Sequence, residues 1–369
     1  MWLLTTARAE LHSFSDPSAV PGGYAILSHT WRAGGKEQSF QEVKRIIKAC
    51  RKGGGNPRDH VDEKIRKCCE RAERDGYAWV WIDSCCINKE SSTELSEAIN
   101  SMFSWYVLAE VCYAFLEDVD TEDDPHAEDS QFQRARWHTR GWTLQELIAP
   151  AFVIFLSKTW ETIGTKYDLV EPLSDCTGIP SPCLTRERSF SAMSIADRMS
   201  WAAHRTTTRV EDEAYCLLGL FNITMPPLYG EGKQAFQRLQ QELAKQSLDT
   251  TLFAWGSIHD ANSSRLTAVG VEKMWSGFHG PSQHKRFLFA SSPRDYRRQF
   301  SLYYTPELSP EGVLQPYLAS QRNYNVRFCD IISEIDPKVA LRAMVRRTCK
   351  RRDPSTGSSF HLSRSPVMV

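Results

Sequence analysis

Apolar residues fall into short runs separated by amphipathic stretches over the first 160 residues of the chain. Four runs are rich in β-branched and aromatic residues and show no polar alternation, at 24–31, 77–83, 111–116 and 152–156. Such runs are typical of parallel strands that helices cover on both faces. Three stretches with helical spacing of apolar residues lie between them, at 40–50, 61–72 and 91–106. The alternation of strand and helix predicts an α/β fold built on a doubly wound parallel sheet.

The pattern changes along the second half of the chain. From about residue 160 the spacing becomes mainly helical, and after Gly256 the signal weakens. We therefore predict four parts: an α/β core, a helical extension, a weakly defined accessory C-terminal region and a disordered basic, serine-rich tail. Their boundaries are 1–160, 161–256, 257–345 and 346–369.

Composition narrows the classes of partner. The 45 basic residues balance 45 acidic ones, so no overall field draws the molecule to nucleic acid. No apolar run approaches the roughly 20 residues of a membrane span. The eleven cysteines are an odd number and several lie in apolar segments, which indicates a reducing compartment and a cytoplasmic location. No cysteine or histidine spacing typical of a metal site occurs, so we expect neither a metal nor a resident cofactor.

Candidate site residues follow the predicted strands. In a doubly wound sheet, ligands bind beyond the carboxyl ends of the strands. The first strand ends in Ser28, His29 and Trp31, the second ends in Asp83, and the helix after the third carries Glu146. We predict that these side chains converge on one cleft.

The segment RGWTLQEL, residues 140–147, is consistent with two interpretations of Glu146. At 100° per residue, Trp142 and Glu146 share the helix face opposite its apolar side. Glu146 is then either a solvated carboxylate or a carboxylate that the Trp142 indole desolvates. In the second case, Glu146 and Asp83 would suit bond cleavage at an anomeric carbon, where carboxylates stabilise an oxocarbenium-like transition state.

A thiol site is the rival reading of the same region. Cys85 follows the second strand, and His29 ends the first. The two could form a nucleophile and its base, although cysteines directly after a buried strand also serve as packing residues.

Longer segments resemble a known family. YAILSHTW (24–31), the stretch 80–106 that begins VWIDSCCINKE, RGWTLQELIAP (140–150) and the stretch 206–243 that begins TTTRVEDEAYCLLGLF are similar to fungal heterokaryon-incompatibility (HET) domain proteins. Members of that family trigger programmed cell death when incompatible fungi fuse, or act in related fungal innate immunity.

The HET domain in turn resembles TIR domains. That resemblance implies a flavodoxin-like fold and, for some members, hydrolysis of NAD to nicotinamide and ADP-ribose products. It implies that Glu146 is the catalytic glutamate, with Trp142 beside it, and gives Ser28 and Asp83 a positional match only. NAD would then be a substrate. The alternative is a non-enzymatic signalling module that acts by self-association or by binding a protein partner.

Overall fold

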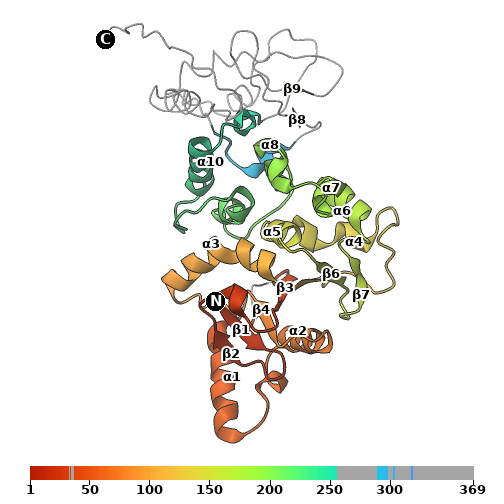
Figure 1. The fold of residues 1–369 in the computed structure, drawn as a ribbon, viewed down its shortest axis with the longest axis vertical. Coiled ribbons are helices and arrows are strands. Elements are labelled where there is room, and N and C mark those ends of the chain that lie inside the picture. The colour runs from red at the N-terminus through yellow and green to blue at the C-terminus, as the bar shows by residue number, and fades with distance from the viewer. Residues whose placement is uncertain (33, 35–36, 256–288, 298–301, 304–316, 319–369) are drawn as a thin grey trace, which may run out of the picture. The chain divides into compact units, whose positions relative to one another are not determined.

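The computed structural model describes residues 1–32, 34, 37–255, 289–297, 302–303 and 317–318 (Figure 1). The chain divides into two compact units, and every described residue belongs to the unit formed by Met1–Thr305 and Pro316–Tyr324. Most of the predicted accessory region 257–345 and all of the predicted tail 346–369 lie outside the described residues. The short pair β8 (Leu302–Tyr303) and β9 (Tyr317–Leu318) is antiparallel.

A seven-stranded mixed sheet forms the centre of the N-terminal part. Its order is β2-β1-β4-β3-β5-β6-β7. The strands are β1 (Trp2–Thr5), β2 (Leu11–Ser13), β3 (Ala25–His29), β4 (Trp79–Ile82), β5 (Val111–Phe115), β6 (Val153–Leu156) and β7 (Thr162–Thr165). The four inner strands β4, β3, β5 and β6 are parallel. Every residue of β3 and β5 is buried, because helices cover both faces of the sheet there.

The predicted α/β fold and its four parallel strands are confirmed. Their order, β4-β3-β5-β6, agrees with the first four strands of the flavodoxin-like order 2-1-3-4-5. The finer flavodoxin-like assignment stays a prediction, because the sheet continues with antiparallel strands at both edges. The sequence analysis did not predict β1, β2 or β7. Each has only three or four residues: the apolar start of β1 is too short to stand out, and β2 and β7 at the two edges are partly exposed and have no continuous apolar run.

Helices α2 and α5 lie on opposite faces of the sheet. Successive side chains of a strand point to opposite faces. Ser28 of β3 hydrogen-bonds to Glu146 of α5, and the next residue, His29, contacts Lys64 of α2. The helices of this part are α1 (Phe40–Gly53), α2 (Glu63–Arg74), α3 (Ser92–Leu108), α4 (Gln131–Arg134) and α5 (Thr143–Ile148).

The start of α3 links the helix to the sheet edge. The Ser91 side chain accepts a hydrogen bond from the backbone N–H of Glu94 and so caps the helix. The Glu94 carboxylate does not return to the cap residue. It accepts hydrogen bonds from Trp2 in β1, at 3.0 Å, and from Asn88, at 3.1 Å. This carboxylate therefore joins the first strand to the helix.

The helical extension consists of short helices. They are α6 (Val170–Thr177), α7 (Ser181–Leu184), α8 (Ile195–Ser200), α9 (Asp212–Tyr215) and α10 (Gln234–Gln246). A separate 3₁₀ helix, Gly219–Phe221, follows α9. A Cβ on Gly219 would lie 2.0 Å from Cβ of Phe103 in α3, so this close approach requires glycine.

Segment 289–297 is attached to α10 by one glutamine. The buried Gln240 amide donates to the carbonyl of Ala290 and accepts from its N–H, both at 2.9 Å. Tyr296 in the same segment is fully buried, and its hydroxyl donates to the carbonyl of Leu252. The segment is thus part of the core.

Replacing Gln240 with leucine is expected to lower the free energy of unfolding by about 2 kcal/mol. The change leaves a buried backbone donor and a buried acceptor of Ala290 without partners, and such groups are costly. Urea unfolding of the full chain measures the loss. The exposed Gln237 of the same helix is the matched control, and its replacement with leucine should leave stability nearly unchanged. Equal stability of both variants would contradict this role for Gln240.

Candidate functional site

Glu146 lies inside the protein, beneath the carboxyl end of β3. All six residues of α5 are buried, so this helix has no solvent-facing side, and the solvated reading of Glu146 was wrong. Ser28 donates a short hydrogen bond to the Glu146 carboxyl group. The Ser28 hydroxyl in turn accepts from the indole N–H of Trp137, at 2.8 Å. The Tyr106 hydroxyl of α3 lies near the Glu146 carboxyl group and donates to the carbonyl of Leu27, at 3.1 Å.

The surroundings of Glu146 favour its neutral form. Burial raises the pKa of Glu146 to about 8, and the negative charge of Asp83 acts in the same direction. The hydrogen bond from Ser28 and the positive charge of Arg205 oppose this rise. At neutral pH the carboxyl group is therefore mostly protonated.

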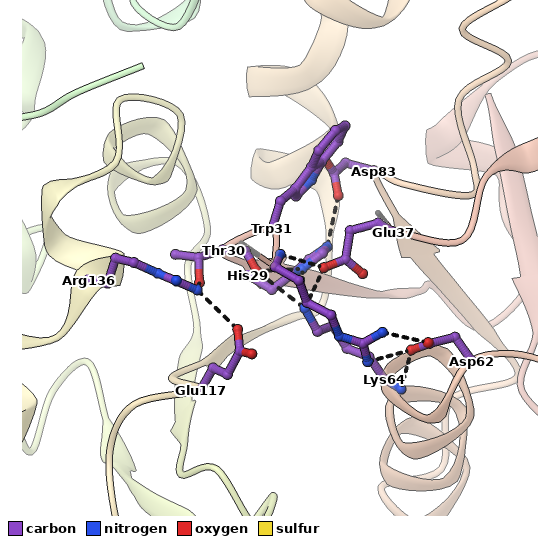
Figure 2. Close-up of polar contacts among 10 residues, drawn as sticks. His29, Thr30, Trp31, Glu37, Asp62, Lys64, Asp83, Glu117 and Arg136 are labelled. Atoms are coloured by element: carbon purple, nitrogen blue, oxygen red, sulfur yellow. Dashed lines mark hydrogen bonds and ion pairs between the residues drawn. The ribbon is translucent and has the colours of Figure 1, made fainter. Parts of the chain in front are cut away.

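Asp83 follows β4, and its surroundings favour the ionised form, in contrast to those of Glu146. It accepts hydrogen bonds from Nε2 of His29 and from Nε1 of Trp31, both at 2.9 Å (Figure 2). Burial acts to raise the pKa of Asp83, but these donors and the charges of His29 and Lys89 hold it at about 2. Its side chain is 25% exposed. Asp83 is therefore an ionised carboxylate at the surface end of the site.

The orientation of His29 is fixed by Lys64 on the other face of the sheet. The Lys64 ammonium lies 3.3 Å from Nδ1 of His29, and an ammonium group can only donate. Nδ1 also lies 3.3 Å from the carbonyl oxygen of Thr30, so the ring is held between Lys64 and Thr30 on one side and Asp83 on the other. Lys64 also forms a buried ion pair with Glu37, at 2.7 Å (Figure 2). This pair holds the residues after β3 against α2.

Two further ion pairs border the same region. Arg136 donates to Thr30, at 2.9 Å, and to Glu117, at 3.0 Å, as Figure 2 shows. Arg32 makes a two-pronged ion pair with Asp62, with distances of 2.6 and 2.8 Å. These contacts connect the segment after β3 to α2 on one side and to the segment after β5 on the other.

The structure brings together five of the six predicted site residues. Ser28 and Glu146 are in contact, and His29, Trp31 and Asp83 form the adjoining polar group. Trp142 is the exception. Its indole lies near the Asp212 carboxyl group of the helical extension and acts to lower the pKa of that group.

The indole next to Glu146 belongs to Trp137, which the sequence analysis missed. Trp137 lies in a 3₁₀ helix, Arg136–Thr139, where the chain has no clear helical spacing. The segment RWHTRGW contains two tryptophans, Trp137 and Trp142. Their closeness in the sequence is the one signal that could have suggested Trp137 as an alternative to Trp142.

The rival thiol site is not assembled. Cys85 is fully buried, and burial raises its pKa well above the usual range. The His29 ring nitrogens face Lys64, the Thr30 carbonyl and Asp83. A protonated, inaccessible thiol without a free base is a poor nucleophile.

The cavities of the described part of the chain include one of about 660 Å³ between α3, α8 and α10. Neither Glu146 nor Ser28 lines it, and neither lines a second, much smaller cavity beside Arg205. Glu146 is therefore covered in this conformation.

The chemistry of the site lies in its two carboxyl groups. One is ionised and partly exposed, and the other is buried and protonated at neutral pH. Environments that push two pKa values apart in this way are typical of acid–base sites, including those that cleave glycosidic bonds. The fold and the site thus define an α/β domain with one ionised and one neutral carboxyl group near the carboxyl ends of its parallel strands.

Comparison with known proteins shows which families parts of the chain resemble. Residues 24–134 match the family described as heterokaryon incompatibility protein (HET), and residues 234–313 match a domain of unknown function, DUF8212. Vegetative incompatibility protein HET-E-1 of Podospora anserina is 46% identical over 234 residues, which are 62% of this chain and 17% of that protein. No solved structure matches the chain. The chain is thus similar to proteins of the HET domain family over these residues.

Two facts limit what the comparison says about the site. The match covers Ser28, His29, Trp31 and Asp83 but ends before Glu146. The chain spans 17% of the length of the relative, so the activity of that whole protein is not carried over here. Among the residues that the structure describes, no helix is long and apolar enough to cross a membrane.

Proposed function

We propose that this chain is a cytoplasmic effector of fungal heterokaryon, or vegetative, incompatibility that causes programmed cell death. The similarity to a vegetative incompatibility protein, 46% identity over 234 residues, carries this proposal. The HET match over residues 24–134 supports it independently.

Cell death would follow from hydrolysis of NAD at the bond between nicotinamide and ribose. The carboxyl pair supports this reaction. The C1′–N bond breaks, its electron pair leaves with neutral nicotinamide, and the ribosyl group becomes an oxocarbenium-like cation. Ionised Asp83 provides the nearby negative charge for that cation. Glu146, once ionised, takes the proton of the water that adds to C1′, which gives ADP-ribose.

The cationic substrate helps to ionise Glu146. A positive charge close to a carboxyl group lowers its pKa, so the substrate itself favours the carboxylate form. Because Glu146 is covered in the conformation described here, the proposal also requires an opening of the site before substrate reaches it. The covered conformation would then be less active than the open one.

Expression of the full chain in a fungal host is expected to arrest growth and deplete cellular NAD. The variant Glu146→Gln keeps the Ser28 hydrogen bond and should restore growth at the same protein level. The exposed Glu128→Gln is the matched control and should remain toxic. Colony growth, NAD content and immunoblotting measure the outcome. Healthy colonies that contain abundant wild-type protein would contradict the effector role.

A non-enzymatic module that acts by self-association is the second candidate. Two neighbouring apolar residues of α3, Val107 and Leu108, are 41% and 42% exposed, and both border the 660 Å³ cavity. Under this alternative, Glu146→Gln would still arrest growth, whereas the double change of Val107 and Leu108 to aspartate would abolish both the arrest and the oligomers seen by light scattering.

A further inference from the structure

The side chain of Trp31 already holds a positive charge on its ring. Trp31 is 39% exposed and lies just beyond the carboxyl end of β3. The Lys89 ammonium lies 3.9 Å from the centre of its indole ring, the shortest cation–π contact among the described residues. The face of an indole carries partial negative charge, so it attracts a cation placed above it. This face is therefore suited to a positively charged group.

Asp83 strengthens the preference for a cation at this place. Its carboxylate accepts the indole N–H of Trp31 at 2.9 Å, which fixes the ring and sets an ionised group at its edge (Figure 2). The Asp83 side chain is 25% exposed, so it also faces solvent. An aromatic plane with a carboxylate at its edge matches a flat ring that carries a positive charge.

The Lys89 side chain can move away from the Trp31 ring. It is an exposed residue in the loop between Asp83 and the start of α3 at Ser92. An exposed cation–π contact is weak, and a cationic ring that replaces the lysine would take over its attraction to Asp83. A ring that stacks on the indole offers a larger contact area than the ammonium group does.

We propose that the Trp31 face now covered by Lys89 is the binding seat for a cationic aromatic ring, with Asp83 as its counter-ion, and that Lys89 must leave before the ring binds. The inference rests on the proposed function, since the nicotinamide ring of NAD is a pyridinium cation. It adds a specific binding site for the ring and names Lys89 as the residue that competes with the ring for this site. Lys89 thereby lowers the affinity of the resting protein for its substrate.

The test uses 1-methylnicotinamide, a pyridinium cation without a ribosyl bond, and neutral nicotinamide as the control ligand. Isothermal titration calorimetry on the full chain measures both. Lys89→Met should bind the cation roughly two- to fivefold more tightly than wild type and should not gain affinity for nicotinamide. Lys89→Arg keeps the competing charge and should bind like wild type. Trp31→Leu should lose binding of the cation.

Three outcomes would overturn the seat: equal affinity of Lys89→Met and wild type, an equal gain for neutral nicotinamide, or no binding of the cation by any variant. Circular dichroism confirms that each variant is folded. Binding here is measured without turnover. A protein that binds the cation as expected but never cleaves NAD would contradict the proposed reaction and leave the seat intact, while cleavage of NAD that Lys89→Met leaves unchanged in KM would contradict the seat alone.

Discussion

Replacing Glu146 with glutamine is expected to reduce nicotinamide release from NAD by roughly 10²- to 10⁴-fold, the usual contribution of a positioned acid–base group. Glutamine has nearly the same shape and can accept the Ser28 hydrogen bond, so the fold should survive. It cannot ionise, and therefore cannot take the proton of the attacking water. Chromatographic measurement of nicotinamide from the purified, activated protein gives the rate.

The pH profile of the wild-type rate separates a chemical role for Glu146 from a structural one. Because burial raises the pKa of Glu146 to about 8 and the carboxylate is the form required, kcat/KM for NAD should rise with pH and level off above about 8. Glu128→Gln, on an exposed loop, should keep both the rate and the profile. Equal rates of nicotinamide release in wild type and Glu146→Gln would refute a catalytic role.

The sequence could predict the inner strands because burial leaves a local mark. Runs such as Val111–Phe115 are apolar on both faces, and this needs no knowledge of distant residues. The edge strands leave no such mark. Leu11–Ser13 is three residues long and mostly exposed, and it becomes a strand only by pairing with β1. Strand pairing depends on residues that are distant in the sequence, so the local spacing of apolar residues does not reveal it.

The site was predictable in position but not in detail. Strand order placed Ser28, Asp83 and Glu146 at one end of the sheet, and the structure agrees. The helical phase of Glu146 pointed to Trp142, whereas the indole that donates to Ser28, the partner of Glu146, is that of Trp137. Phase identifies a solvent side only when a helix has one, and α5 is covered all around by β3, α3 and the 3₁₀ helix that carries Trp137.

The contacts of Lys64 could not be predicted from the sequence for a different reason. A lysine in the first turn of an amphipathic helix ordinarily reaches solvent, and its burial here depends on Glu37, 27 positions earlier in the chain. The two charges and His29 stabilise one another only when the fold brings them together. No local pattern distinguishes this lysine from the exposed Lys67, one turn further along the same helix.

Stability should depend on pH through Glu146, with a sign opposite to that of most carboxylates. Its pKa is raised from about 4.5 in the unfolded chain to about 8 in the folded one, so between these values the folded state holds one more proton. The free energy of unfolding then falls as pH rises, by at most about 1.4 kcal/mol per pH unit. The stabilisation is complete below pH 4.5 and is lost as the pH passes 8.

The difference between wild type and Glu146→Gln isolates this effect. Two other buried groups make the free energy of unfolding rise with pH instead. Burial lowers the pKa of His138 to about 3, so its contribution changes below about pH 6.5. Burial lowers the pKa of Lys166 to about 8, so its contribution changes above about pH 8. Their contributions are the same in both proteins and cancel. From pH 6.5 to 8, wild type should lose about 2 kcal/mol relative to the variant in urea unfolding. Parallel pH curves for the two proteins would show that Glu146 is already ionised in the folded state, and would remove the basis for its pH-dependent role in catalysis.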